Sequence, residues 1–322
     1  MYLSMVVFEE CLAEYHPRMT GHSDLIKIKF MGVQEAMEGQ EYLPDHMLLE
    51  HVEYFVSHPV PAAWGCLCIG EPPEDLFKNN ICLIFPENTD RTSLYHDIQK
   101  IFFLYNSWEM EIRKAMQRNA TLEEMCNLCI PIFEKPIFIH DRNNELLAIA
   151  NEMAGQFSWQ YDETFDKYYL PLEILNTFKS SDEYHKTLHT YGAHVFSAKA
   201  TGYRTLYVNL RIEWVYVGRV CLDEIGTPIR KRDYELLEFF ADNIALAMQQ
   251  GMLLVSDVSN VLSILFKEMI DGKSYTKNQL AKPFSYYKWH IDDMFQCITI
   301  FCRKSDNAIH TATNLTHRLA NM

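Results

Sequence analysis

The stretch from Arg204 to Gln250 constrains the fold most, because it predicts two strands followed by a long helix. The first strand alternates, with Leu206, Val208, Leu210 and Ile212 on one face and Tyr207, Asn209 and Arg211 on the other. A second strand from about Val215 to Leu222 follows a tight connection, so the pair predicts a hairpin in which Gly218 marks a bulge or a close backbone approach. Thr227-Pro228 predicts the start of a helix with an apolar stripe that runs to Met248. An antiparallel hairpin feeding a long helix is not typical of a nucleotide-binding enzyme.

Composition restricts the class of protein further. The chain of 322 residues is long enough for two or three domains. Its formal net charge of −14 disfavours a nucleic-acid surface over most of the chain, since phosphate contacts need clustered Lys and Arg. No apolar run is long enough for a membrane span, and the N-terminus lacks the features of a signal peptide. Nine scattered cysteines fit reduced thiols, so we expect a cytoplasmic protein.

Residues 1–118 are predicted to form an N-terminal regulatory α/β domain with a connector helix. Short apolar runs bounded by turn residues predict its strands, and longer periodic runs predict its helices. The strands are Lys27–Val33, Trp64–Ile69 and Asn80–Phe85, and the helices are Leu3–Tyr15, Asp45–Val56 and Arg91–Arg118.

Residues 119–251 are predicted to form a second domain with an antiparallel sheet and flanking helices. Thr121 is a helix cap, and the helix runs through Cys129. Two strands, Pro136–His140 and Glu145–Ala150, flank a turn-rich connection. An aromatic-rich and partly helical segment covers residues 151–191, and a third strand, His194–Ala198, precedes the hairpin.

The segments PIFIHDRNNELLAIAN, YVGRVCLDE and the exit helix resemble a GAF/PAS-type sensor domain. The following SDVSNVLSILFKEMIDG and KPFSYYKWHIDDMFQCITIF are similar to the entry into the degenerate GGDEF-like domain of bacterial transcription regulators of the PucR/CdaR type, which control purine catabolism and sugar-diacid use. Residues 252–322 would then hold a linker helix and an incomplete GGDEF-like domain. The overall fold class is α+β. The resemblance implies that DNA binding belongs to a C-terminal helix-turn-helix absent from this sequence.

The aromatic-rich segment is the predicted ligand-facing element. In sensor domains of this resemblance, a small molecule binds between the sheet and such a cover, and polar groups of the sheet fix its orientation. The candidate ligand-binding residues are His140, Phe157, Trp159, Tyr161, Tyr169, His194, Tyr207, Asn209 and Arg211. The alternative is that these aromatic residues only fill a core.

The sequence gives no positive sign of catalysis, cofactor or metal. Glycine-rich phosphate loops, nucleophile elbows and HExxH motifs are all missing from it. Cys126 and Cys129 form a CxxC pair, but a zinc site needs four ligands and Cys66 and Cys68 have the wrong spacing. Two small residues on one helix face are more typical of a core.

We therefore expect the regulatory portion of a transcription regulator that is not an enzyme. A small-molecule effector binds the central domain, and the long helix relays the change. That helix continues into an apolar run at residues 252–255, which predicts a homodimer seam, although a break at Gly251 is the alternative. Other functions left open are a ligand-free dimerisation or protein-interaction module, a metal or redox sensor at the CxxC pair and, least favoured, a nucleotide cyclase or phosphodiesterase.

Overall fold

The computed structural model describes most of residues 1–249. The exceptions are residues 22, 36–40, 44, 59, 164–165 and 213–214; beyond 249, only 269, 274–277, 280, 284 and 289–290 are described. The predicted dimer seam lies outside the described residues, and so does nearly all of the predicted GGDEF-like segment. Within the described part, every helix is too short or too polar to cross a lipid bilayer.

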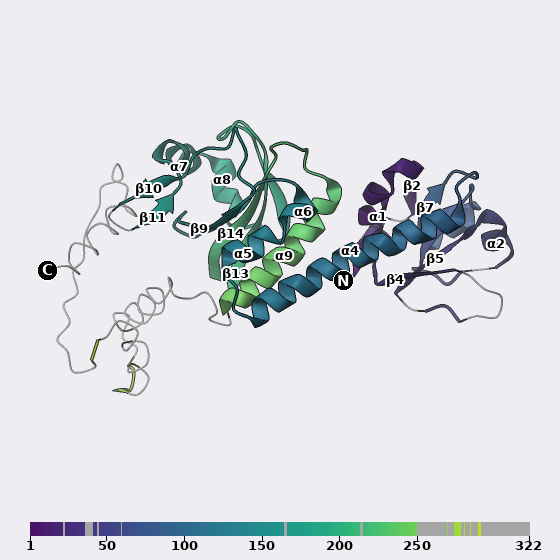
Figure 1. Cartoon of the computed structure of the whole chain (residues 1–322), viewed down its shortest axis with the longest axis horizontal. Coiled ribbons are helices and arrows are strands. Elements are labelled where there is room, and N and C mark those ends of the chain that lie inside the picture. Colours follow the sequence, from purple (N-terminus) through teal and green to yellow (C-terminus); the bar gives the residue numbers. More distant parts are fainter. Residues whose placement is uncertain are drawn as a thin grey trace.

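The N-terminal unit contains a five-stranded sheet in the order β2-β7-β6-β5-β4 (Figure 1). β4 to β7 run parallel, and β2 is antiparallel to β7. The strands are β2 (Arg18–Gly21), β4 (Gly32–Glu35), β5 (His46–His51), β6 (Gly65–Ile69) and β7 (Ile81–Phe85). A separate pair, β1 (Leu3–Ser4) and β3 (Lys29–Phe30), lies beside it.

Helices cover both faces of this sheet. Leu48, Cys66 and Cys82 share one buried cluster with residues of α2 (Val52–Ser57) and α3 (Glu74–Asn79). The alternate residues of the same strands face α1 (Met5–Cys11) and α4 (Arg91–Gln117). The two-residue alternation of β-strands therefore produces a three-layer α/β arrangement.

The predicted helix over Asp45–Val56 is wrong in its first half. Residues His46–His51 form β5, and only Val52–Ser57 are helical. Met47, Leu48 and Leu49 are all fully buried, because a parallel strand inside a sheet is covered on both faces and becomes a continuous apolar run. Such a run lacks the alternation that predicts a strand.

α4 runs along both units and contributes to a shared core (Figure 1). Asp90 caps its start by accepting a hydrogen bond of 2.8 Å from the Ser93 backbone N–H. Near the other end, the Trp108 ring lies 6.0 Å from the Phe133 ring and 5.3 Å from the Phe239 ring. The helix therefore packs on the central domain as well as on the N-terminal sheet.

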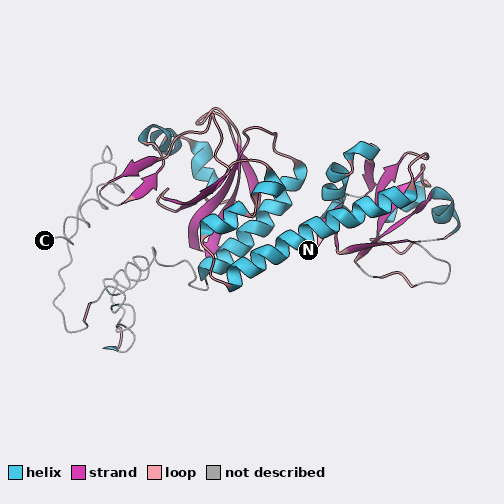
Figure 2. Ribbon diagram, in the orientation of Figure 1, coloured by secondary structure: helices cyan, strands magenta, loops and turns pink. Residues whose placement is uncertain are grey.

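The central domain has a five-stranded antiparallel sheet in the order β12-β13-β14-β8-β9. Helices lie on both sides of it (Figure 2). The strands are β8 (Ile137–Asp141), β9 (Leu146–Ala150), β12 (Ala193–Phe196), β13 (Thr205–Ile212) and β14 (Val215–Asp223). The predicted mixed α+β class, with an antiparallel sheet and flanking helices, is confirmed.

The two sheet faces have different partners. One, the helix face, packs on α5 (Leu122–Asn127), α6 (Ile130–Phe133) and α9 (Lys231–Gln249). The other, the cover face, lies under α7 (Leu172–Lys179) and α8 (Asp182–Thr187). The hairpin of β10 (Gln160–Asp162) and β11 (Lys167–Tyr169) is bridged through Tyr169 to Glu145, next to the edge strand β9. Residues 151–191 are therefore the cover that the sequence predicts, with a short hairpin that it does not.

The irregularity predicted at Gly218 is present. The β13–β14 register shifts between Leu210 and Arg211, next to the partner of Gly218. A Cβ atom at Gly218 would lie 2.4 Å from the carbonyl oxygen of His140, so only glycine allows β8 and β14 to approach this closely.

Candidate functional site

A row of polar residues crosses the middle of the cover face. Arg219 on β14 is paired in register with Asn209 on β13 and with His140 on β8. The next row on the same face contains Tyr207, Cys221 and Phe138. The intervening residues of β13, such as Val208 and Leu210, point to the helix face instead.

Arg219 is the central member of this row, and only 4% of it is exposed. Its Nε donates to Asn209 Oδ1 at 3.0 Å, and one terminal nitrogen, Nη2, donates to Thr187 Oγ1 at 2.9 Å. Three aromatic rings surround the guanidinium. Its central carbon lies 4.4 Å from the ring centre of Tyr207, 5.6 Å from that of Tyr184 and 6.0 Å from that of Tyr216.

Arg219 has no acidic partner within the described part of the chain, where no aspartate or glutamate forms an ion pair with it and Nη1 donates to no acceptor. Removing an unpaired cation from water costs several kcal/mol. Each cation–π contact returns about 0.5–2 kcal/mol. Among the described residues, the guanidinium is therefore held in place by neutral groups and has no anionic partner.

His140 lies beside Arg219 and is buried as deeply, at 4% exposed. Its Nδ1 is 2.8 Å from the carbonyl oxygen of Asp141. Burial, and secondly the positive charge of Arg219, lower the pKa of His140 to about 3. The imidazole is therefore neutral near pH 7. With Nδ1 as the donor to the carbonyl, Nε2 is left as an acceptor.

Aromatic side chains pack between the sheet and the cover. The Phe138 ring lies 5.3 Å from Trp159 and 6.3 Å from Phe157, both in the segment that enters the cover. Phe178 of α7 stacks on Tyr184 of α8 at 4.6 Å. The indole nitrogen of Trp159 is enclosed and has no hydrogen-bond partner within the described residues.

The structure brings together five of the nine predicted ligand-binding residues. His140, Phe157, Trp159, Tyr207 and Asn209 all belong to the cover face or to the aromatic side chains packed on it. This grouping fits both sequence interpretations, a ligand site and a filled core.

Three of the other four predicted residues lie apart from this group, whereas His194 pairs in register with Tyr207 and its ring centre lies 6.2 Å from that of Tyr207. Tyr161 is 49% exposed and donates to Asp166 at 2.6 Å within the β10–β11 hairpin. Tyr169, in the same hairpin, is half-buried, and burial raises its pKa to about 12. His194 is exposed at the sheet edge, and Arg211 donates to the Leu188 carbonyl at 2.6 Å while lining an open groove beside α9.

The sequence interpretation missed Arg219, Thr187 and Tyr184. A signal for Arg219 is present, because alternation along Val215–Asp223 places it on the same face as Asn209 of the paired strand. Thr187 and Tyr184 lie in the cover, whose position over the sheet has no short-range signal.

Asp223 ends β14 on the cover face and is fully buried. Its carboxylate accepts hydrogen bonds from Thr205 Oγ1 at 2.7 Å and from Gln156 Nε2 at 2.9 Å. Burial nevertheless raises the pKa of Asp223 to about 6.

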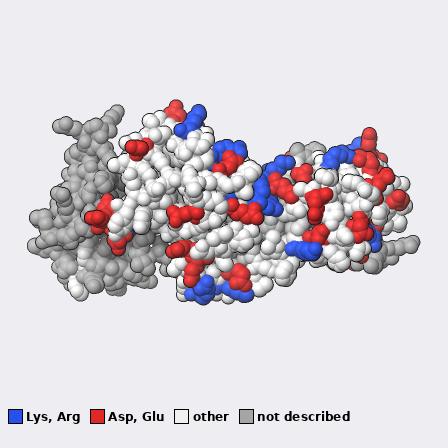
Figure 3. All heavy atoms as spheres, turned by 45° about the horizontal axis from the view of Figure 1, so that its top comes forward, with Lys and Arg blue, Asp and Glu red and all other residues white. Residues whose placement is uncertain are grey.

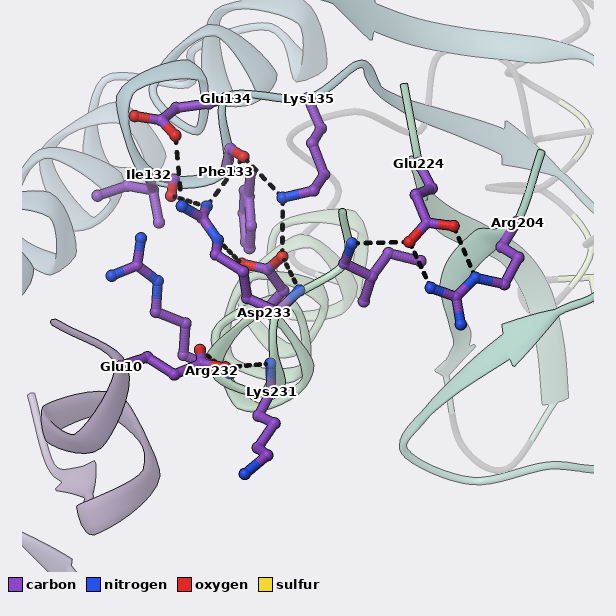
Figure 4. Close-up of polar contacts among 12 residues, drawn as sticks. Glu10, Ile132, Phe133, Glu134, Lys135, Arg204, Glu224, Lys231, Arg232 and Asp233 are labelled. Atoms are coloured by element: carbon purple, nitrogen blue, oxygen red, sulfur yellow. Dashed lines mark hydrogen bonds and ion pairs between the residues drawn. The ribbon is translucent and has the colours of Figure 1, made fainter. Parts of the chain in front are cut away.

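A second polar cluster holds the start of α9 on the opposite side of the domain (Figure 4). Lys135 and Asp233 form a fully buried ion pair of 2.9 Å. Asp233 also accepts from the Arg230 backbone N–H at 2.9 Å, and from Arg230 Nε at 3.1 Å. Burial lowers the pKa of Lys135, while the carboxylate of Asp233 opposes that shift.

The N-terminal unit supplies the remaining cap of α9. The Glu10 carboxylate of α1 accepts the backbone N–H of Lys231 at 2.8 Å and that of Arg232 at 2.9 Å. The predicted start at Thr227-Pro228 is therefore wrong. The Thr227 hydroxyl has no partner among the described residues, whereas Asp233 and Glu10 satisfy the first free N–H groups of a helix that begins at Lys231.

Cys126 and Cys129 are buried among core side chains. Burial raises the pKa of both thiols. Over the residues that the structure describes, no group of three His, Cys, Asp or Glu side chains is arranged to hold a metal ion.

No protein-family model matches the chain, and no curated protein matches it. Solved GAF domains are similar in fold. The cofactor-binding GAF domain of the nutrient sensor CodY from Clostridium difficile is 12% identical, with 45% of this chain and 97% of that chain covered and a TM-score of 0.32. The phycoerythrobilin-bound GAF domain of a cyanobacterial phytochrome is 9% identical, with 45% of this chain and 94% of that chain covered and a TM-score of 0.34. A GAF/HD-domain protein from Geobacter sulfurreducens is 12% identical, with 43% of this chain and 96% of that chain covered and a TM-score of 0.28.

Proposed function

We propose that the chain is the sensory portion of a bacterial one-component transcription regulator, whose central domain binds a small-molecule effector between its sheet and its cover. The observation that carries this proposal is Arg219, a buried cation with neutral partners among the described residues. A charge that the fold does not balance is costly to retain for stability alone, and perturbed buried charges concentrate at functional sites.

The relay to the rest of the protein runs through the sheet to α9. Asn209 on the cover face alternates along β13 with Val208 and Leu210, which pack in the same core as α9. Glu238 of α9 accepts the Ala193 backbone N–H of β12 at 2.8 Å. An effector that displaces β13 or α8 therefore acts on α9, and a differential affinity of a few kcal/mol is enough to shift the helix between two positions.

The finer assignment follows the sequence resemblance. We place the chain in the PucR/CdaR type, with a GGDEF-like domain after α9, a homodimer in solution and DNA binding through a further C-terminal domain. On the face drawn in Figure 3, acidic and basic side chains of the described residues are interspersed. That pattern and the formal net charge of −14 fit a regulatory part better than a DNA-binding one.

A ligand-free dimerisation module is the second candidate. Three large apolar side chains on α4 are exposed: Phe103 at 75%, Leu104 at 47% and Met110 at 50%. Exposed apolar residues grouped on one helix are typical of a contact surface.

Thermal-shift screening of the full chain against a metabolite library separates the two functions. A sensor gains about 2.7 kcal/mol of stability at a ligand concentration 100 times the Kd, which raises its Tm by several degrees. If no compound raises the Tm, and if Phe103→Asp with Met110→Asp converts a dimer to a monomer in light scattering, the sensor function is wrong and the module is supported.

A further inference from the structure

We infer that the effector is a small organic monocarboxylate with an apolar body, and that its carboxylate pairs with Arg219. This inference rests on the proposed function and adds the chemical class of the ligand. It assigns the missing counter-ion of the buried guanidinium to the ligand.

The charge balance on the cover face favours a single negative charge. Glu183 of α8 is already engaged, because it accepts the Ser197 backbone N–H at 2.9 Å and the Ser197 hydroxyl at 2.7 Å. Asp223 is engaged by Thr205 and Gln156. In the described part of this face, the buried Arg219 guanidinium therefore remains to be neutralised, and a phosphate dianion would leave an uncompensated buried charge.

The guanidinium is also oriented before a ligand arrives. Asn209 and Thr187 fix Nε and Nη2, and the Tyr207 ring lies 4.4 Å from the central carbon. Nη1 keeps two N–H groups without an acceptor in the described part of the chain. A planar carboxylate matches this planar donor, and pre-orientation reduces the entropy lost on binding.

The aromatic side chains around the polar row favour a ligand with an apolar body. Phe138 and Trp159 meet edge to face at 5.3 Å, and Phe178 and Phe196 meet in the same way at 5.2 Å. Sites lined by aromatic side chains around a few placed polar groups bind ligands with an apolar body and one charged end. The unpartnered indole N–H of Trp159 is a further donor on this side of the sheet.

The test uses acid and amide pairs of the same shape with the full chain. The pairs are phenylacetate and phenylacetamide, benzoate and benzamide, and isovalerate and isovaleramide; inorganic phosphate is a separate probe. Thermal shift and isothermal titration should show that at least one acid binds and that its amide does not. Arg219→Met keeps the unbranched apolar stem, removes the guanidinium charge and should weaken binding of the acid roughly thirtyfold or more.

Two further variants make the result specific. Arg142→Met removes an exposed arginine from the turn of the same domain and should leave acid affinity unchanged. Arg219→Lys keeps the charge and should retain the acid preference with reduced affinity, which covers the case in which Arg219→Met does not fold by circular dichroism.

The acid and amide titrations overturn the inference in any of three cases: an amide binds as well as its acid, Arg219→Met binds the acid as the parent does, or every acid binds more weakly than about 1 mM. If the metabolite screen instead yields a neutral or cationic effector, the sensor function stands and the carboxylate assignment fails.

Discussion

At the residue scale, the two faces of the central sheet differ in buried ionisable groups. The cover face holds His140, Arg219 and Asp223, each almost or fully buried. The helix face packs residues such as Val208, Leu222 and Phe240 in an apolar core. Burial lowers the pKa of His140 to about 3 and raises that of Asp223 to about 6, so it shifts both groups towards their neutral forms. Arg219 supplies the buried guanidinium of the three.

We predict that the folded protein loses stability as the pH rises through the pKa of Asp223. Its pKa of about 6 in the folded protein exceeds the ordinary aspartate value of 3.8, so the folded state binds the proton more tightly. The contribution of Asp223 to the free energy of unfolding is fully present below the pKa of the unfolded chain. It is lost as the pH rises through the pKa of the folded protein, and the loss is about 2–3 kcal/mol at most. Urea unfolding from pH 4 to 7 should show that Asp223→Asn removes this component. Parallel curves for the variant and the parent would contradict the assignment.

Sequence alternation located part of the candidate site. The sequence names Tyr207 and Asn209 on one face of their strand, and the structure places both around Arg219. The same rule, applied to the second strand, would have named Arg219. Tyr161 and Tyr169 were predicted from composition alone, and the β10–β11 hairpin holds them away from the polar row.

At the element scale, α9 shows why a helix start can escape sequence analysis. Asp233 accepts the backbone N–H of Arg230 from within the helix. Glu10, more than 200 residues earlier in the chain, accepts the next two backbone N–H groups. Long-range caps leave no mark in a short window. The apolar stripe from Leu236 to Met248 was correctly predicted, because periodicity is local and every helical turn repeats it.

We predict that breaking the Lys135–Asp233 pair costs much more stability than removing both of its charges. Asp233→Ala leaves Lys135 buried without its acidic partner and should lower the free energy of unfolding by about 3–5 kcal/mol. The double variant Lys135→Met with Asp233→Leu removes both charges and should recover much of that loss. Chemical unfolding of the single and double variants measures the difference. Additive losses would show that the charges are not coupled.

At the scale of the whole molecule, α9 connects the polar row to the N-terminal unit. Its residues Leu237 and Phe240 lie in the core shared with the helix face, and its first turn is capped by Glu10 of α1. Figure 4 shows Glu10, from α1, and Asp233, from the first turn of α9 itself, at the same helix end. Two units that hold one helix form a physical route for coupling.

The Glu10 contact should therefore change ligand affinity from the far side of the sheet. Glu10→Ala removes the carboxylate that restrains the Lys231 and Arg232 amides, so moving α9 costs less. Where binding displaces α9, the best acid of the panel should bind about fivefold or more tightly, which corresponds to about 1 kcal/mol of coupling. Titration calorimetry measures that affinity, with exposed Glu14→Ala as the matched control. Equal affinities in the parent, Glu10→Ala and Glu14→Ala would show that the N-terminal unit and the cover face act independently. Coupling free energy is reciprocal between sites, so ligand binding would then leave the Glu10 contact unchanged as well.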